Sequence, residues 1–269
     1  MSTGPHPGTE PGFPAAFVAR CLDDALAHGA RVYGIAGLQG TGKSTLAAQM
    51  ATLAAERGIA TAVLSVDDAY LDHDERAALA RDVHPLLATR GPPGTHDVAL
   101  ACHTLDALRA GEPVALPRFD KLGDRRLPES DWPRVGPVDL VLFEGWFLGT
   151  PPESPATLVE PLNPLERDED PDGRWRRWCN DALARNYPAL WRRIDRLLFL
   201  QGPGFDVVPE WRWQQEHSLQ AEHPGRKAMT RAQVERFVQF FERTSRQALR
   251  TLPGIADAVA PLDAQRRPL

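Results

Sequence analysis

The clearest chemical signal in the sequence is a glycine-rich segment near the N-terminal end of the chain. It reads Gly37-Leu38-Gln39-Gly40-Thr41-Gly42-Lys43-Ser44 and fills every fixed position of the pattern G-x-x-x-x-G-K-S. An apolar run of strand character precedes this glycine loop, and a helical pattern follows it from Thr45. In that setting backbone N–H groups converge on phosphate, Lys43 reaches the β- and γ-phosphates, and the Ser44 hydroxyl binds Mg²⁺. We therefore expect residues 37–45 to bind a nucleoside triphosphate; the alternative is a glycine-rich turn that binds nothing.

Phosphoryl transfer also needs metal ligands and a group that orients the acceptor hydroxyl, and two acidic residues have suitable positions. Glu144 and Asp67 each follow an apolar run that ends there. Because functional groups collect at the carboxyl ends of parallel strands, both should face the glycine loop. We expect Glu144 to join Ser44 at the metal, and Asp67 to act as the base and a further metal partner. The alternatives are a strand-end charge or helix cap for Glu144 and a turn residue for Asp67, whose neighbour Asp68 should point elsewhere.

Hydrophobic periodicity predicts an α/β protein whose central sheet is mostly parallel. Strands are predicted over residues 32–36, 61–66, 138–143, 194–200 and, weakly, 256–260. Helices are predicted over residues 13–29, 45–57, 97–110, 175–193, 207–222 and 230–249. The stretches 72–95 and 151–173 show neither period and are predicted to be irregular. Residues 1–12 should form a flexible tail and residues 13–269 one domain, with lid or insertion elements within 151–180 and 205–231.

Composition limits the class of protein and its partners. The 269 residues are 42% hydrophobic and 25% charged, as in soluble globular proteins, and the formal net charge is −5. This charge gives no support for a nucleic-acid partner or an anionic membrane surface. No apolar stretch approaches the roughly 20 residues that span a bilayer. The three cysteines are widely spaced and form no C-x-x-C pair, so we expect a cytoplasmic protein with reduced thiols.

Two short elements resemble those of a known kinase group. Ser65-Val66-Asp67-Asp68-Ala69-Tyr70 is similar to the S-x-D-x-F-Y element of the uridine kinase, phosphoribulokinase and pantothenate kinase group of P-loop kinases. In that group the aspartate at the position of Asp67 is the catalytic base. Phe143-Glu144-Gly145 resembles the group's strand-end E-G, whose glutamate serves the metal site. The resemblance implies a P-loop NTPase fold with three αβα layers, a helical lid, and ATP and Mg²⁺ as cofactors.

Further elements, in order, resemble the D-glycerate 3-kinase branch in its plant and fungal form with bacterial relatives. They lie at residues 90–97, 116–121, 143–149, 162–166, 170–175, 211–216 and 229–238, within a likeness that extends over about 32–250. Ala69 departs from the usual Phe, and Phe119 stands where Tyr is common, which removes a hydroxyl from the acceptor pocket. The branch implies transfer of the γ-phosphoryl group to a primary hydroxyl, the 3-hydroxyl of D-glycerate. A nucleoside, pantothenate or another sugar acid is the alternative acceptor.

An acceptor with one carboxylate and two hydroxyls needs cations and polar groups, and arginine suits a carboxylate because its guanidinium can bind both oxygens. Candidates between the second and third predicted strands are the cations Arg90, His96, Arg118 and Lys121, and Tyr70, Asp97 and Asp120 for the hydroxyls. Cations of the predicted lid that could close over the phosphates are Arg212, Arg226 and Lys227. Each of these residues could instead be structural or belong to a solvated surface.

The competing class is an ATP-binding regulatory protein that has no small-molecule acceptor. A GTPase would need the guanine-reading sequence N-K-x-D, which the chain does not contain. Lys43, Ser44, Asp67 and Glu144 are all present, and this favours an active kinase. The sequence indicates no particular oligomeric state.

Overall fold

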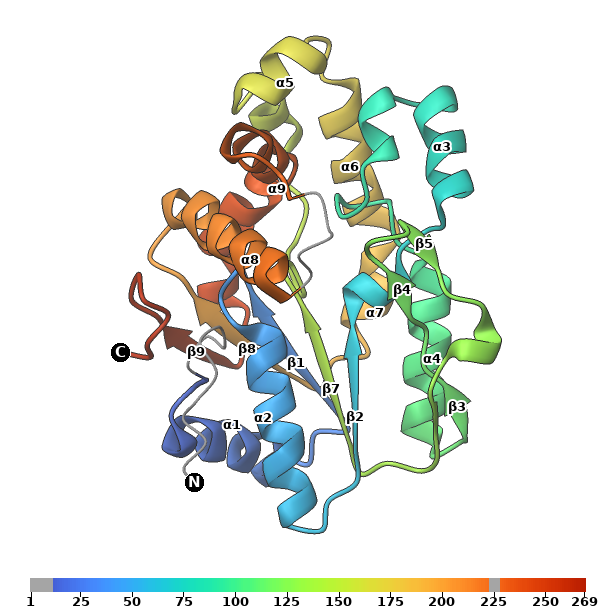
Figure 1. Cartoon of the computed structure of the whole chain (residues 1–269), viewed down its shortest axis with the longest axis vertical. Coiled ribbons are helices and arrows are strands. Elements are labelled where there is room, and N and C mark those ends of the chain that lie inside the picture. Colours follow the sequence, from blue (N-terminus) through green and yellow to red (C-terminus); the bar gives the residue numbers. More distant parts are fainter. Residues whose placement is uncertain (1–11, 223–227) are drawn as a thin grey trace.

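The computed structural model describes residues 12–222 and 228–269 of the chain. Its centre is a five-stranded sheet in the order β2-β7-β1-β8-β9, in which neighbouring strands are parallel (Figure 1). The strands are β1 (Val32–Gly37), β2 (Thr61–Ser65), β7 (Leu140–Gly145), β8 (Arg196–Gln201) and β9 (Ala258–Pro261). The five strands predicted from the sequence are therefore confirmed, with ends shifted by a residue or two.

The position of β7 between β1 and β2 brings the predicted chemical groups to one edge of the sheet. In the register, Glu144 of β7 lies opposite Ile35 of β1 on one side and Ser65 of β2 on the other. The glycine loop leaves β1 at Gly37, and Asp67 follows the end of β2. Because the three strands are parallel, their carboxyl ends meet, which is where α/β proteins place their ligands.

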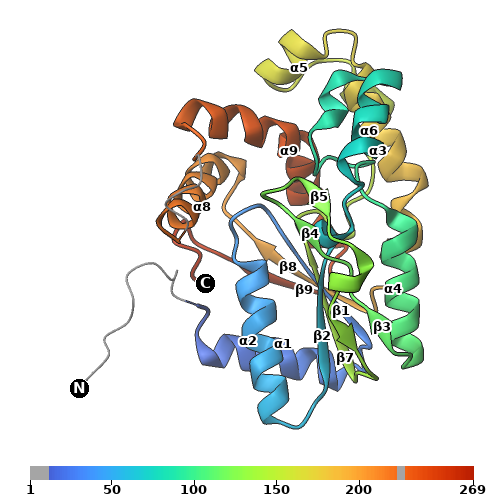
Figure 2. The ribbon, with the colours of Figure 1, turned by 45° about the vertical axis from the view of Figure 1, so that its right-hand side comes forward.

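Helices cover both faces of the sheet, so the fold has three layers, αβα (Figures 1 and 2). One face packs on α1 (Ala15–Ala27) and α2 (Lys43–Glu56), and the other packs on α4 (Val98–Ala110), α6 (Arg174–Arg185), α7 (Tyr187–Trp191) and α9 (Arg231–Thr251). Successive strand residues alternate between the two layers: Tyr33 and Ile35 face α1 and α2, whereas Val32 and Ala36 face the opposite layer. A parallel sheet covered on both faces explains why its strands read as continuous apolar runs.

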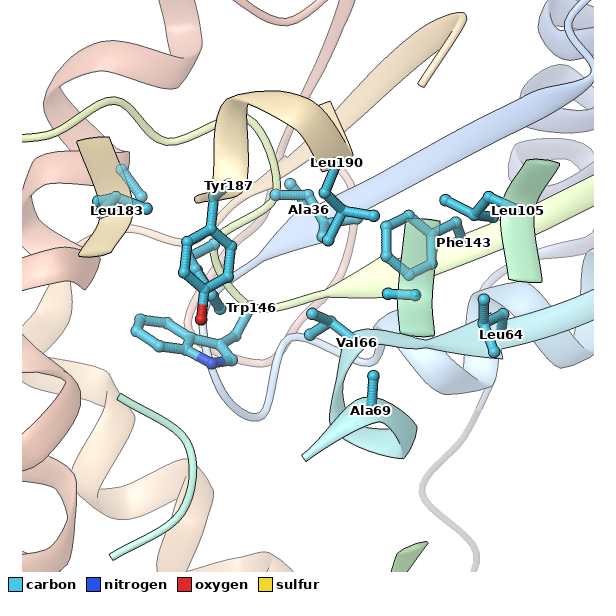
Figure 3. Packing of buried hydrophobic residues seen from close by; sticks show 14 of the residues in the cluster. Ala36, Leu64, Val66, Ala69, Leu105, Phe143, Trp146, Leu183, Tyr187 and Leu190 are labelled. Carbon is cyan, nitrogen blue, oxygen red and sulfur yellow. The ribbon is translucent and has the colours of Figure 1, made fainter. Parts of the chain in front are cut away.

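The larger core cluster covers one face of the sheet and extends to its carboxyl edge. Phe143 of β7, Trp146 and Tyr187 lie in one layer with Leu190 and Val66 (Figure 3). Each of these side chains is at most 4% exposed. Burying a side chain of this size contributes about 2 kcal/mol. The strand ends that carry Glu144 and Asp67 are thus anchored by packing close to the site.

Two stretches predicted to be irregular contain helices. Residues 72–95 include α3 (His73–Asp82), which is closed at its N-terminus by a reciprocal capping box between Asp72 and Glu75. Residues 151–173 include α5 (Pro164–Glu169), capped by the side chain of Asn163. Both helices have few buried positions, so they lack the apolar period on which the prediction relied.

Two small antiparallel pairs follow α4. β3 (Val114–Ala115) pairs with β6 (Arg134–Val135), and β4 (Phe119–Asp120) pairs with β5 (Arg125–Arg126). The β4–β5 hairpin packs on the 3₁₀ turn η1 (Val66–Ala69) that carries Asp67.

Helix α8 (Val208–Glu222) packs against α9. The predicted helix 175–193 is divided into α6 and α7, with Pro188 in the first turn of α7. Across residues 12–222 and 228–269, no helix combines the length and apolarity that crossing a membrane requires.

Candidate active site

The glycine loop turns sharply between β1 and α2. Gly40 and Gly42 have φ values of 80° and 88°, a backbone region that other residues enter only at a cost. A Cβ atom on Gly40 would also lie 2.6 Å from the Cβ atom of Trp211 in α8. Thr41 closes the turn, because its backbone N–H and its hydroxyl both donate to the Leu38 carbonyl. Position 40 therefore requires glycine for two reasons: the backbone has a positive φ, and Trp211 leaves no room for a Cβ atom.

Lys43 begins α2 and turns its side chain back into the loop. Its Nζ donates to the Leu38 carbonyl at 3.0 Å, and the side chain is buried. Burial lowers the pKa of Lys43, while the charges of Glu144 and Asp67 act in the opposite direction. A phosphate in the loop would give this buried ammonium an anionic partner at close range.

Ser44 and Glu144 face each other across the carboxyl edge of the sheet. Ser44 Oγ donates to Glu144 Oε1 at 3.0 Å. Glu144 is 7% exposed and belongs to a strand in which every residue is buried, so its carboxylate is held in place. A hydroxyl and a carboxylate oxygen side by side are hard donors of the kind that Mg²⁺ prefers. The pair fits the metal site predicted for it.

Asp67 is held by the turn η1, which begins where β2 ends. The Ser65 hydroxyl accepts a hydrogen bond from the Asp67 N–H at 3.2 Å and caps the turn. Asp67 Oδ2 accepts a hydrogen bond from Lys121 Nζ at 2.9 Å. Burial alone would raise the pKa of Asp67, but the Lys121 ammonium and hydrogen bonds from Lys121 and Tyr70 outweigh it and lower the pKa. Asp67 is therefore ionised at neutral pH.

Asp68 has a separate set of partners. One of its oxygens accepts from the Ser65 N–H and from Arg118 Nη1, each at 3.3 Å. Burial raises the pKa of Asp68, and the nearby Arg118 opposes this effect. The two adjacent carboxylates thus face different groups, as the sequence suggested.

These groups border a cavity of about 200 Å³ at the carboxyl edge of the sheet. Its walls come from the glycine loop, the ends of β2 and β7, the β4–β5 hairpin, and helices α8 and α9. The lining residues are Gln39, Gly40, Lys43, Ser44, Asp67, Tyr70, Arg90, Lys121, Glu144, Trp146, Arg212, Gln215, Phe237 and Phe241. The cavity joins the predicted phosphate cradle to space in which an acceptor could bind.

Three of the predicted acceptor residues, Tyr70, Arg90 and Lys121, line this cavity. Arg90 is held on two sides: its Nη1 donates to Asp124, and its Nη2 donates to the Lys121 carbonyl at 3.0 Å. Its guanidinium lies over the ring of Phe119. Two cations therefore flank the space in front of Asp67.

The other four predicted acceptor residues do not line the cavity, as far as the described chain shows. His96 lies behind Tyr70, with ring centroids 4.8 Å apart, and its Nδ1 is 2.7 Å from the Tyr187 hydroxyl. Burial lowers the pKa of His96 to about 4, so the imidazole is neutral and is not a cation for a carboxylate at neutral pH.

Asp97, Arg118 and Asp120 have structural partners. Asp97 caps α4 through the Leu100 N–H and pairs with Arg126. Arg118 pairs with Asp68, and the Asp120 carboxylate accepts from the Leu122 N–H.

Of the predicted lid cations, the structure places one at the cavity. Arg212 of α8 lines it, and Arg212 Nη2 pairs with Glu216 at 3.2 Å. Arg226 and Lys227 lie outside the described residues.

Three further residues of the predicted triphosphate site line a different cavity, whereas Gly37, the last residue of β1, and the buried Leu38 line neither cavity. Thr41, Gly42 and Thr45 line a second cavity of about 280 Å³, together with Phe13 and residues 265–268. Residues of the glycine loop therefore border two cavities.

Sequence reasoning missed four lining residues: Trp146, Gln215, Phe237 and Phe241. Trp146 could have been found, because it follows the strand-end pair Glu144-Gly145. Phe237 and Phe241 stand one helical turn apart on α9, but the sequence does not show that this turn faces the sheet edge.

Comparisons with known proteins agree with this fold and site. No protein-family model matches the chain. The uncharacterized kinase mug58 of Schizosaccharomyces pombe is 34% identical over 227 residues, which cover 78% of each protein. The chloroplastic D-glycerate 3-kinase of Arabidopsis thaliana is 34% identical over 221 residues, which cover 77% of this chain and 45% of that protein. A solved structure of the D-glycerate 3-kinase from Cryptococcus neoformans superposes with a TM-score of 0.73 and 27% identity, over 95% of this chain and 96% of that one.

The αβα fold, the glycine loop and the acidic strand ends define a P-loop kinase. The chain belongs to the same family of P-loop kinases as the fission-yeast kinase, to which it is 34% identical over 78% of that protein. It is also similar in sequence and fold to proteins named D-glycerate 3-kinase. The resemblance inferred from the short elements is thereby confirmed, and the regulatory alternative loses its support.

Proposed function

We propose that this protein transfers the γ-phosphoryl group of ATP to the 3-hydroxyl of D-glycerate, forming 3-phosphoglycerate and ADP. One observation carries the proposal: a half-buried, ionised aspartate and two cations, Arg90 and Lys121, border a single cavity that opens on the glycine loop. The aspartate can accept a proton from a hydroxyl group, and the two cations can bind a carboxylate. Two relatives named for glycerate phosphorylation support this acceptor.

In the proposed reaction Asp67 accepts a hydrogen bond from the 3-hydroxyl and takes its proton. The hydroxyl oxygen then bonds to the γ-phosphorus, and the bond between that phosphorus and the bridging oxygen breaks to release ADP. Lys43 at the base of the glycine loop stabilises the negative charge on the phosphates. Arg212, which lines the cavity from α8, would add positive charge on the opposite side.

Ser44 and Glu144 are the residues that would hold Mg²⁺. A bound Mg²⁺ neutralises phosphate charge and fixes the geometry of the triphosphate. The two oxygens are already 3.0 Å apart and need no rearrangement of the sheet to serve one ion. Asp67, predicted as a further metal partner, borders the same cavity.

Arg90 and Lys121 would bind the carboxylate of glycerate, and Tyr70 would contact a hydroxyl. The apolar wall formed by Trp146, Phe237 and Phe241 limits the space to a small acceptor. We propose no binding role for the four predicted residues outside the cavity. The cytoplasmic location and the lack of a nucleic-acid partner stay predictions from composition.

The test is ADP release by the purified protein with Mg²⁺ and ATP, coupled to a spectroscopic assay, over D-glycerate, pantothenate and uridine. We expect D-glycerate to give the highest kcat/KM and ³¹P NMR to identify the product as 3-phosphoglycerate. If the protein phosphorylates pantothenate or uridine but not D-glycerate, the assignment of D-glycerate as the acceptor is wrong, while the assignment of kinase activity stands. ADP release that no acceptor stimulates would favour an ATP-binding regulatory protein.

A further inference from the structure

The β4–β5 hairpin contains an aspartate in an unusual backbone conformation, close to the proposed acceptor site. Asp124 has a φ of 53°, and Arg266 is the one other non-glycine residue with positive φ in the part of the chain that the structure describes. Non-glycine residues rarely adopt left-handed backbone, because their Cβ atom then crowds a neighbouring carbonyl oxygen, although aspartate tolerates it better than most. Such conformations cluster at active sites and ligand-binding sites, and they persist only where surrounding contacts hold them. The contacts of the Asp124 carboxylate show what holds it.

The two oxygens of Asp124 bind two different arginines. Oδ1 accepts from Arg90 Nη1 at 2.5 Å, and Oδ2 lies 2.8 Å from Arg76 Nη2. Arg76 is 1% exposed and also donates to the backbone carbonyls of Leu71, Ala88 and Asp124. Arg76 is therefore a fixed anchor beneath the hairpin. Of the two arginines that bind Asp124, Arg90 lines the cavity.

The hairpin fixes Arg90 by three contacts in all. Besides the Asp124 carboxylate, the Lys121 carbonyl accepts from Arg90 Nη2, and the ring of Phe119 lies 5.6 Å from the guanidinium carbon. The hairpin itself is tied to the segment that carries the proposed base, through Lys121 with Asp67 and Arg118 with Asp68. One short hairpin thus supplies one cation of the cavity and orients the other.

We infer that Asp124 is a positioning residue that holds the Arg90 guanidinium at the acceptor pocket, and that the β4–β5 hairpin thereby selects an acceptor with an anionic group. This inference rests on the proposed function, because it concerns the same cavity and the same reaction. It adds a residue outside the cavity, Asp124, that determines specificity through its ion pair with Arg90. An arginine whose rotamer is fixed before binding loses less entropy when it binds a carboxylate.

Two substitutions separate the carboxylate of Asp124 from its backbone conformation. Asp124→Asn keeps the shape and tolerates left-handed backbone, but its amide group can accept from only one of the two arginines. Asp124→Gly adopts positive φ without strain and removes the carboxylate altogether. If the carboxylate acts as inferred, both variants raise the KM for D-glycerate at least tenfold and leave the KM for ATP within about twofold. Asp131→Asn, an exposed position in the same polar region, is the matched control and should behave as the wild type.

A double-mutant cycle with Arg90→Gln shows whether Asp124 acts through Arg90. The expected result is that Asp124→Asn raises the KM for glycerate in the wild type, but by less than twofold when Arg90 is already glutamine. A purely structural role for Asp124 would give the same KM change in both backgrounds, and this result would overturn the inference. Circular dichroism melts of all variants identify any loss that comes from unfolding.

The wild type separates failure of this inference from failure of the proposed function. Turnover of an anionic acceptor by the wild type, with an unchanged KM in both Asp124 variants, overturns the inference and leaves the kinase reaction intact. If the wild type phosphorylates uridine but neither glycerate nor pantothenate, the cavity does not select an anionic acceptor. Both the proposed function and this inference are then wrong. If pantothenate is used in place of glycerate, the same KM effects are expected for pantothenate, and only the identity of the acceptor changes.

Discussion

Lys121 Nζ lies 2.9 Å from Asp67 Oδ2, so the proposed base and one of the acceptor-site cations form an ion pair in front of the glycine loop. The pair keeps Asp67 ionised although burial acts in the opposite direction. In return, the Asp67 charge raises the pKa of Lys121. An acceptor that carries both a hydroxyl and a carboxylate could engage the two partners at once.

Replacing Lys121 by methionine should therefore affect both binding and the pH profile. We expect the KM for D-glycerate to rise about tenfold or more, because one of the two cations is gone. Without the ammonium, the pKa of Asp67 rises, so the acid limb of kcat/KM moves to higher pH in the variant. The measurement is kcat/KM from pH 7 down to the lowest pH at which both proteins stay folded, because the pKa of Asp67 in the wild type lies below its usual value. Identical acid limbs in the two proteins would show that Lys121 does not set the ionisation of Asp67.

Substitutions of Ser44 and Glu144 should change the Mg²⁺ requirement. Glu144→Gln can still accept the Ser44 hydrogen bond, so its fold should hold, but it loses the anionic oxygen offered to the metal. We expect the Mg²⁺ concentration for half-maximal rate to increase at least tenfold. Ser44→Thr keeps the hydroxyl and should need far less additional Mg²⁺ than Ser44→Ala. A wild-type Mg²⁺ dependence in Glu144→Gln would remove Glu144 from the metal site.

Gly40→Ala and Gly58→Ala form a matched pair for the glycine loop. Both glycines have positive φ, but a Cβ atom on Gly40 would lie 2.6 Å from Trp211, whereas one on Gly58 meets no atom within 4 Å. Gly58→Ala should lower the free energy of unfolding by about 1 kcal/mol and leave ATP binding unchanged. Gly40→Ala should weaken ATP binding by more than tenfold in calorimetric titration. Equal ATP affinities would show that the contact between the loop and α8 does not shape the phosphate site.

His96 should make the fold sensitive to acid. Its pKa is lowered from 6.5 to about 4 by burial, so between these values the unfolded chain binds a proton that the folded chain does not. The stability that depends on neutral His96 is therefore complete above pH 6.5 and is lost as the pH falls towards 4. Between pH 7 and 4.5 this loss amounts to about 2–3 kcal/mol.

Urea unfolding of the wild type and of His96→Phe at both pH values isolates this contribution from that of other groups. Phenylalanine suits the surrounding rings of Tyr70, Phe147 and Tyr187 and cannot be protonated. As the pH falls from 7 to 4.5, we expect the free energy of unfolding of His96→Phe to increase by about 2–3 kcal/mol relative to that of the wild type, because only the wild type takes up the proton on unfolding. A difference that does not change with pH would show that His96 does not titrate on unfolding.

Much of the fold followed from the sequence because its strands are buried on both faces and its strand ends carry charge. The five strands, the glycine loop, and the positions of Asp67 and Glu144 could all be located by apolar runs that end in polar residues. Helix α3 could not be found in this way, since its one buried residue is Arg76. A better signal was present in Asp72 and Glu75, whose spacing is that of a capping box.

The acceptor side was harder to predict because it depends on contacts between distant segments. Arg90, Lys121 and Arg212 were recognised as cations of a possible site, but so were Arg118 and His96, which the fold uses elsewhere. Spacing along the chain does not reveal which cation pairs with a structural carboxylate. Asp124 illustrates the point: its importance lies in a left-handed backbone and two arginines that are 34 and 48 residues away.

The most direct test of the account is glycerate-dependent ADP release by the wild type and by Asp67→Asn, measured with Mg²⁺ at saturating ATP. The asparagine keeps the shape of the turn but cannot take the proton of the acceptor hydroxyl. We predict a kcat lower by about 10²- to 10⁴-fold in the variant, the usual effect of removing a general base, with ATP affinity unchanged within about threefold. A variant that retains the wild-type kcat would contradict the assignment of Asp67 as the base, on which the proposed reaction rests.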